Sequence, residues 1–128
     1  MNLLLDTQAF LWFINGDTRL SEEARELIED VDNPLFLSKA SLWEMAIKIS
    51  IGKLELAEPF GKLIPAQLTL HDIIILPIEI EHINEVIALP LHHRDPFDRL
   101  IIAQAIVQKL PLVGADSQFD KYQISRLW

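Results

Sequence analysis

The strongest constraint on the fold is a set of short apolar runs that show no alternation with polar residues. They are residues 2–5 (NLLL), 35–38 (LFLS), 73–78 (IIILPI) and 111–115 (PLVGA), with residues 124–128 (ISRLW) as a candidate for the last. A strand whose side chains are apolar on both faces must be covered on both faces, which is typical of parallel sheets. These runs therefore predict buried strands.

Helical patterns separate the apolar runs. They cover residues 7–14 (TQAFLWFI), 21–30 (SEEARELIED, with Ser21 as the expected N-cap), 41–50 (SLWEMAIKIS) and 95–109 (DPFDRLIIAQAIVQK). Strands that alternate with helices indicate an α/β fold, with helices on both faces of a mainly parallel sheet of four or five strands. Residues 52–72 contain two glycines and two prolines, so we expect a loop and an irregular helix there.

The length and the charge narrow the class of protein. A chain of 128 residues has the usual size of one domain, and we expect residues 1–128 to form a single domain. No membrane span or signal peptide is recognisable, so a cytoplasmic protein is expected. The net charge of -8 argues against a broad phosphate-binding surface. Acids gathered around a divalent cation would reverse that charge locally.

Two aspartates come directly after predicted strands, where the chain turns into a helix. Asp6 ends the stretch LLLD and Asp116 ends LVGAD. Ligands of parallel sheets bind outside the carboxyl ends of the strands, so both carboxylates are expected near a ligand. Either one alone could instead be a simple N-cap that accepts a backbone N–H. Their occurrence together at one sheet edge favours a functional site.

Three further acids belong to the predicted helices. Asp95 precedes a proline, which is typical of an N-cap followed by proline in the first turn. Asp98 opens a helix that is apolar nearly all round, so its carboxylate is expected to face something specific. Glu44 closes the stretch SLWE, which also matches a Ser-x-x-Glu capping box that starts at Ser41. Both interpretations of Glu44 stay open, and Trp43 beside it is expected to pack in the core.

An all-oxygen set of candidate ligands results: Asp6, Glu44, Asp98 and Asp116. Clustered carboxylates repel one another unless a cation compensates, and hard oxygen ligands select Mg²⁺ or Mn²⁺. We expect the four histidines to be surface residues or to lie outside the ligand shell, because none has the helical spacing of zinc enzymes. The chain has no glycine-rich phosphate loop and no Gly-x-Ser-x-Gly nucleophile motif.

Four segments of the chain carry a family resemblance: LLLDTQAFLW, SKASLWEMAIKISIGKL, LPLHHRDPFDRLIIAQA and PLVGADSQFDKY. In this order they resemble PIN-domain proteins of the VapC type, the ribonuclease toxins of bacterial toxin–antitoxin pairs. The resemblance implies a three-layer α/β/α sandwich whose acids hold Mg²⁺ or Mn²⁺ for hydrolysis of RNA, with one or two ions left open. Carried over by motif, the implied catalytic and metal-binding residues are Asp6, Glu44, Asp98 and Asp116, whereas Asp95 is not an implied ligand. Gly114 departs from the pattern, because relatives often have threonine there.

The resemblance also implies partners. They are an RNA substrate, a small antitoxin of the VapB type and a second copy of the chain in a homodimer, with no membrane. Exposed aromatic residues would supply apolar surface for such partners, and the candidates are Trp12, Phe13, Trp43 and Trp128. Three basic residues near the acids could contact RNA phosphates or could be solubilising charges: Lys39, Arg94 and Arg99.

Two other functions remain as alternatives. A phosphotransfer or phosphatase domain also places an aspartate at a strand end, but a dehalogenase-like site has Asp-x-Asp where this chain has Asp6-Thr7-Gln8. An inactive interaction module of the same fold would keep the acids as helix caps only. Binding of Mn²⁺ would separate such a module from an enzyme, because caps alone bind no metal.

Overall fold

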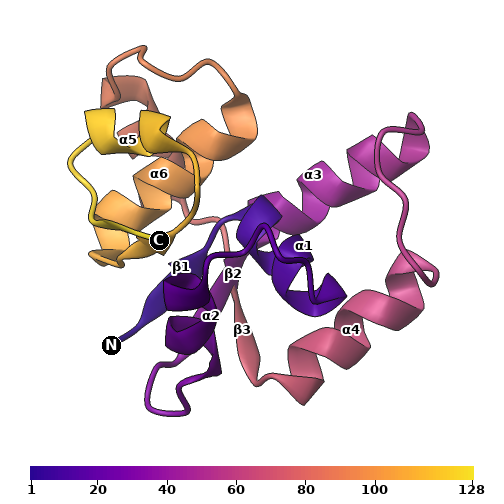
Figure 1. The fold of residues 1–128 in the computed structure, drawn as a ribbon. Coiled ribbons are helices and arrows are strands. Elements are labelled where there is room, and N and C mark those ends of the chain that lie inside the picture. The colour runs from indigo at the N-terminus through magenta and orange to yellow at the C-terminus, as the bar shows by residue number, and fades with distance from the viewer.

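The computed structural model describes residues 1–128 and contains a five-stranded sheet in the order β3-β2-β1-β4-β5, in which every pair of neighbours is parallel (Figure 1). The strands are β1 (Leu3–Leu5), β2 (Leu35–Ser38), β3 (Ile73–Leu76), β4 (Leu112–Val113) and β5 (Arg126–Leu127). Each lies inside one of the apolar runs. The expected α/β class and the parallel sheet are confirmed.

Alternate residues of β1 face the two layers of helices. Leu3 and Leu5 pack in a core with α1 (Thr7–Asn15), α2 (Glu22–Glu29) and α4 (Phe60–Leu70). Leu4 packs in a second core with α6 (Pro96–Gln108), and Val86 of α5 (Ile80–Ala88) lies against that core. The layers lie on opposite sides of the sheet (Figure 1). Burial on both faces explains why the strand sequence shows no polar alternation.

Helix α3 (Lys39–Ser50) contributes to both cores, with Ala40 in one and Met45 in the other. Its N-cap is Ser38, whose side chain accepts from the Ala40 N–H, and Ser41 lies inside the helix. The capping box predicted from Ser41 to Glu44 is therefore wrong. Trp43 was expected either in the core or on an exposed apolar surface, and at 60% exposure it lies on the surface.

The segment before α6 differs most from expectation. Residues 80–88 form α5, which was not among the predicted helices, and residues 60–70 form α4, which contains Pro65 and lies where a loop and an irregular helix were expected. His82 of α5 is fully buried rather than at the surface, and its ring bonds the Glu79 N–H and the Gln108 side chain. None of the helices combines the length and the apolar character needed to cross a membrane.

The strand order places the turning point of the topology beside β1. The chain moves outward from β1 to β2 and β3, and then returns across β1 to β4 and β5. At such a switch point the connections leave a crevice outside the carboxyl ends of the strands, where ligands bind in open parallel sheets. Asp6 follows β1 directly at this edge.

Candidate metal centre

One cleft of about 270 Å³ at the carboxyl edge of the sheet brings the four predicted acids together. They come from different elements: Asp6 follows β1, Glu44 lies on α3, Asp98 lies in the first turn of α6, and Asp116 follows β4. All four line the cleft, together with Asp95. The predicted proximity of these side chains is thus present in the folded chain.

Asp6 is a helix cap and also a cleft residue. Its Oδ1 accepts the Ala9 N–H at 2.6 Å at the start of α1, and the side chain is buried. Burial raises the pKa of Asp6 to about 7, with further increases from the negative charges of Asp98, Glu44 and Asp116 and an opposing effect of the Ala9 N–H. The buried position thus disfavours the charged form of Asp6 in the protein alone.

Gly114 lies directly against Asp6. A Cβ added at Gly114 would come within 2.7 Å of Asp6 Oδ2, a distance that real Cβ atoms essentially never show. The absence of a side chain at this position therefore gives the Asp6 carboxylate its space. A threonine here, as in the pattern of relatives, would require Asp6 to move.

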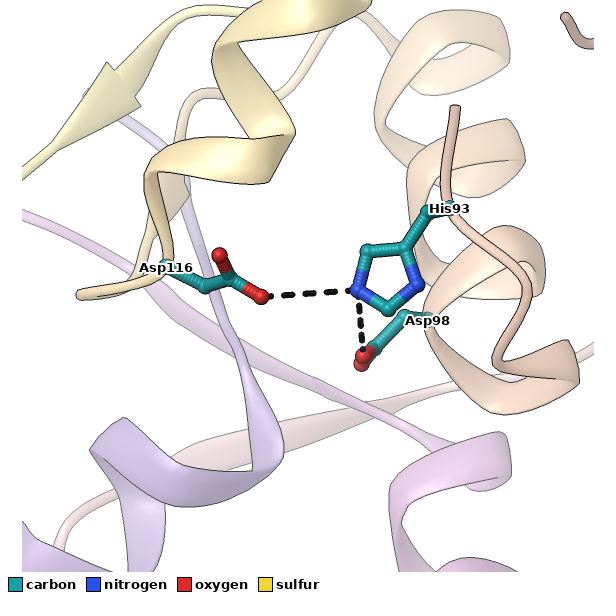
Figure 2. Close-up of side chains that lie close together, drawn as sticks. All are labelled: His93, Asp98 and Asp116. Carbon is teal, nitrogen blue, oxygen red and sulfur yellow. Dashed lines mark ion pairs between the residues drawn. The ribbon is translucent and has the colours of Figure 1, made fainter. Parts of the chain in front are cut away.

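The two aspartates of DPFD have different surroundings. Asp95 caps α6, because its Oδ1 accepts the N–H groups of Phe97 at 2.8 Å and Asp98 at 3.2 Å, as predicted. The carboxylate of Asp98 forms no such cap and points into the cleft (Figure 2). Burial, and then the charge of Asp95, raise the pKa of Asp98 to about 6, against a lowering effect of His93.

His93 belongs to the site, although its position in the sequence did not suggest it. Its Nε2 lies 3.1 Å from Asp98 Oδ2 and 3.4 Å from Asp116 Oδ2, between the two carboxylates (Figure 2). The three side chains offer ligand atoms that all lie within 4.8 Å of one another. Asp116 also caps the short 3₁₀ helix η1 (Ser117–Lys121) through the Gln118 N–H.

Glu44 is held by neighbours that the sequence pattern did not reveal. The Thr7 hydroxyl lies 2.8 Å from Glu44 Oε1 and 2.8 Å from Ser41 Oγ, and the Lys48 ammonium donates to Glu44 Oε2 at 2.6 Å. Glu44 and Thr7 are buried, whereas the Lys48 side chain is 45% exposed. This network fixes the carboxylate at the cleft wall and does not cap a helix.

Arg99 does not reach the cleft. Its guanidinium donates to the backbone carbonyls of Val86, Leu89, Pro90 and His93. It therefore fastens the loop before α6, and this placement does not support a contact of Arg99 with RNA phosphates. The cations that do line the cleft are Lys48 and Lys53.

The donor set fits a hard divalent cation. Four carboxylates from separate elements share one cleft, and burial, followed by the charges of neighbouring acids, raises the pKa values of Asp6 and Asp98. Carboxylate oxygens are the ligands that Mg²⁺ and Mn²⁺ prefer. A bound cation would relieve the repulsion that the protein alone does not.

Comparison with known proteins finds solved structures that have a similar fold. Two solved structures are similar to nearly the whole chain: a chain of VapBC2 from Rickettsia felis bound to a promoter DNA fragment (TM-score 0.73, 17% identity, 99% of this chain and 98% of that one), and a chain of DNA-bound VapBC from Salmonella typhimurium (TM-score 0.71, 17% identity, 99% and 97%). At this identity the likeness concerns the fold.

A sequence match and a family model show which known proteins this chain is related to. Ribonuclease VapC16 of Mycobacterium tuberculosis is 44% identical over 43 residues, which make up 34% of this chain and 30% of that protein. The match thus spans less than a third of the length of that relative. Residues 3–124 match the family model of the PIN domain, which covers strands β1 to β4, all the helices and every acid of the cleft. The chain is a member of the PIN-domain family.

Proposed function

We propose that the protein is a Mg²⁺- or Mn²⁺-dependent endoribonuclease that acts as the toxin of a toxin–antitoxin pair. The observation that carries the proposal is the convergence of Asp6, Glu44, Asp98 and Asp116 on one cleft at the switch point of a PIN-domain sheet. The sequence match to a protein named ribonuclease VapC16 supports the choice of RNA as the substrate.

The four carboxylates are the proposed metal ligands. When bound, a divalent cation would supply stabilisation of the developing charge on the phosphodiester and activation of the attacking water. The chain's own hydrogen bonds fix the positions of the carboxylates. The Ala9 N–H fixes Asp6, and Thr7 and Lys48 fix Glu44, so the carboxylates stand ready before a cation or a substrate arrives.

Lys48 and Lys53 are the proposed contacts for RNA phosphates. They are the basic residues of a cleft wall that otherwise carries five acids, and a chain with a net charge of -8 needs such local positive charge. The turn after α3 holds the pair together, because the N–H of Lys53 donates to the Lys48 carbonyl at 2.8 Å. They replace Arg99 in that role.

The proposed partners are a small antitoxin and a second copy of the chain. The similar structures from Rickettsia felis and Salmonella typhimurium are of VapBC complexes, which supports an antitoxin of the VapB type. Exposed isoleucines on one helix, α5, supply apolar surface for a partner: Ile80, Ile83 and Ile87.

Paired substitutions in the motif DPFD test the proposed function. The Asp98→Asn variant should lose Mn²⁺-dependent cleavage of single-stranded RNA, because it keeps the shape and removes a ligand charge. The Asp95→Asn variant should cleave nearly as fast as the wild type, since asparagine also caps helices. Cleavage is measured with end-labelled RNA, with and without EDTA.

The other outcomes have definite meanings. Wild-type protein that binds no Mn²⁺ and cleaves no RNA would make the chain an inactive interaction module. A larger loss of cleavage in Asp95→Asn than in Asp98→Asn would contradict the ligand assignment within DPFD.

A further inference from the structure

Hydrogen bonds hold the backbone of His93, and an aromatic contact holds its ring. Its N–H donates to Tyr122 Oη at 2.7 Å, and its carbonyl accepts from the Arg99 guanidinium at 3.2 Å. The ring lies nearly parallel to that of Phe119, with 5.9 Å between centroids and 25° between planes. Both the position and the tilt of the imidazole are therefore fixed by its surroundings rather than by the carboxylates that it faces.

The hydrogen bond at the far side of the ring decides where its proton lies. Nδ1 accepts the backbone N–H of Asp95 at 3.3 Å. An acceptor nitrogen carries no proton, so the neutral ring must carry its proton on the other nitrogen, Nε2. That nitrogen points between Asp98 and Asp116 (Figure 2).

A metal ligand would need the opposite arrangement. Imidazole binds a metal through an unprotonated nitrogen, and its other nitrogen then donates a proton, commonly to a carbonyl or a carboxylate. In this fold the partner of Nδ1 is the N–H of Asp95, which cannot accept a proton. The surroundings of His93 thus suit a donor at Nε2 and oppose a ligand there.

We propose that His93 is a positioning residue whose Nε2–H holds the carboxylates of Asp98 and Asp116 in place for a divalent cation, and that it is not itself a ligand of that cation. The inference rests on the proposed function, because it concerns the same site. Asp98 comes from α6 and Asp116 from the loop after β4, so the Nε2–H of His93 connects two different elements of the fold. Groups that orient metal-binding carboxylates in this way typically change metal affinity by about 10- to 100-fold when removed.

The proton on the ring can be observed directly. In ¹⁵N-labelled wild-type protein at pH 8, the two- and three-bond ¹H–¹⁵N correlations distinguish the Nε2–H from the Nδ1–H tautomer. We expect the Nε2–H tautomer for His93 both without metal and with saturating Mg²⁺. A shift of the proton to Nδ1 on addition of Mg²⁺ would overturn the proposal, because it would make His93 a ligand.

Calorimetric titration of Mn²⁺ into variants tests the positioning role. The His93→Leu variant should bind Mn²⁺ about tenfold or more weakly than the wild type. The His93→Gln variant, which can place an N–H in a similar position, should recover most of the affinity. His92 is the matched control, because its side chain is exposed and its ring contacts Tyr122 rather than the carboxylates.

The results separate the inference from the proposed function. Wild-type affinity in His93→Leu, or a loss in His92→Leu as large as in His93→Leu, would overturn the inference alone. Equal losses in His93→Gln and His93→Leu would likewise overturn the donor role. Failure of the wild type to bind Mn²⁺ would overturn the proposed function and the inference together.

Discussion

Asp6 is both a helix cap and a proposed metal ligand, and only the second role requires a charged carboxylate. Its carboxylate caps α1 through the Ala9 N–H, yet it is buried beside Glu44, Asp98 and Asp116. The cap could be made equally well by a neutral asparagine. A charged carboxylate at this position is required by the proposed cation and not by the helix cap.

The stability of the metal-free protein should depend on the Asp6 proton. The folded-state pKa of about 7 lies above the ordinary value of 3.8, so the native state holds this proton more tightly than the unfolded chain between these values. The contribution of Asp6 to the free energy of unfolding is therefore largest at low pH and is lost as the pH rises from about 4 to 7. Urea denaturation in EDTA should give a flatter pH profile for Asp6→Asn than for the wild type over this range. Parallel profiles would contradict the raised pKa.

Glu44→Gln separates charge from packing at the cleft wall. Glutamine can still accept the Thr7 hydroxyl but loses the ion pair with the half-exposed Lys48, so the free energy of unfolding should change by about 1 kcal/mol or less. Mn²⁺-dependent cleavage should fall sharply, because a ligand charge is removed. If Glu44→Gln cleaves RNA at the wild-type rate, Glu44 is structural and the site shrinks to three aspartates.

The sequence could predict the carboxylates of the site better than the residues that cap the helices or hold the carboxylates in place. An aspartate directly after an apolar strand has one location in a parallel sheet, so Asp6 and Asp116 were foreseeable. Ser38 rather than Ser41 starts α3, and the short Ser-x-x-Glu pattern could not reveal which serine caps. His93 was missed because its partners are distant in the fold, and a histidine in a loop has no periodic spacing.

At the scale of elements, the end of α3 and the turn after it carry Lys48 and Lys53, the proposed contacts for RNA phosphates. The Lys53→Gln variant should reduce the slope of log affinity against log salt by about 0.7 for single-stranded RNA, the value for one lost phosphate contact. The measurement uses the Asp98→Asn background, in which the RNA should remain intact. Lys62→Gln is the control, because Lys62 lies on α4 and pairs with Glu58 at 3.5 Å. An unchanged slope in Lys53→Gln would remove Lys53 from the RNA path.

Helix α5 shows why one element escaped prediction. Its apolar residues Ile80, Ile83 and Ile87 are exposed, and its one fully buried residue is the polar His82. These isoleucines recur at i, i+3 and i+7, which is a helical period, but they do not form a buried face, and the helix is fastened to α6 by hydrogen bonds of His82 and by Arg99. Strands β1 and β4, in contrast, are buried on both faces and lie in uninterrupted apolar runs, whereas the edge strand β3 exposes Ile74 and Ile75 and is less covered than its apolar run predicted.

At the scale of the whole molecule, the exposed face of α5 predicts association. Wild-type protein at tens of micromolar should have twice the 14.7 kDa mass of the chain in light scattering. The Ile87→Glu variant should shift it toward the monomer, because Ile87 is 82% exposed and its replacement leaves the core intact. A wild-type monomer, or a dimer unaffected by this change, would contradict the role of α5.

The division of the fold into layers could be predicted from the sequence. The surface that binds a partner could not, because no sequence pattern shows which side chains stay exposed. Strand and helix alternation fixes a parallel sheet with two covered faces. Which surface binds an antitoxin depends on side chains whose exposure appears only after folding, as Trp43 illustrates. The sequence left that residue open between the core and the surface, and it lies exposed with its ring edge-on to Phe97 at 5.3 Å between centroids.

The most direct test of the central claim is anomalous diffraction at the manganese edge from crystals grown with Mn²⁺. A peak is expected in the carboxylate cleft at coordination distance, about 2.1 Å for a hard divalent ion, from oxygens of the four proposed ligands, Asp6, Glu44, Asp98 and Asp116. The His93 imidazole should lie outside that shell. A structure without a peak in the cleft at saturating Mn²⁺, or with one held elsewhere on the surface, would contradict the claim that these carboxylates form a metal site.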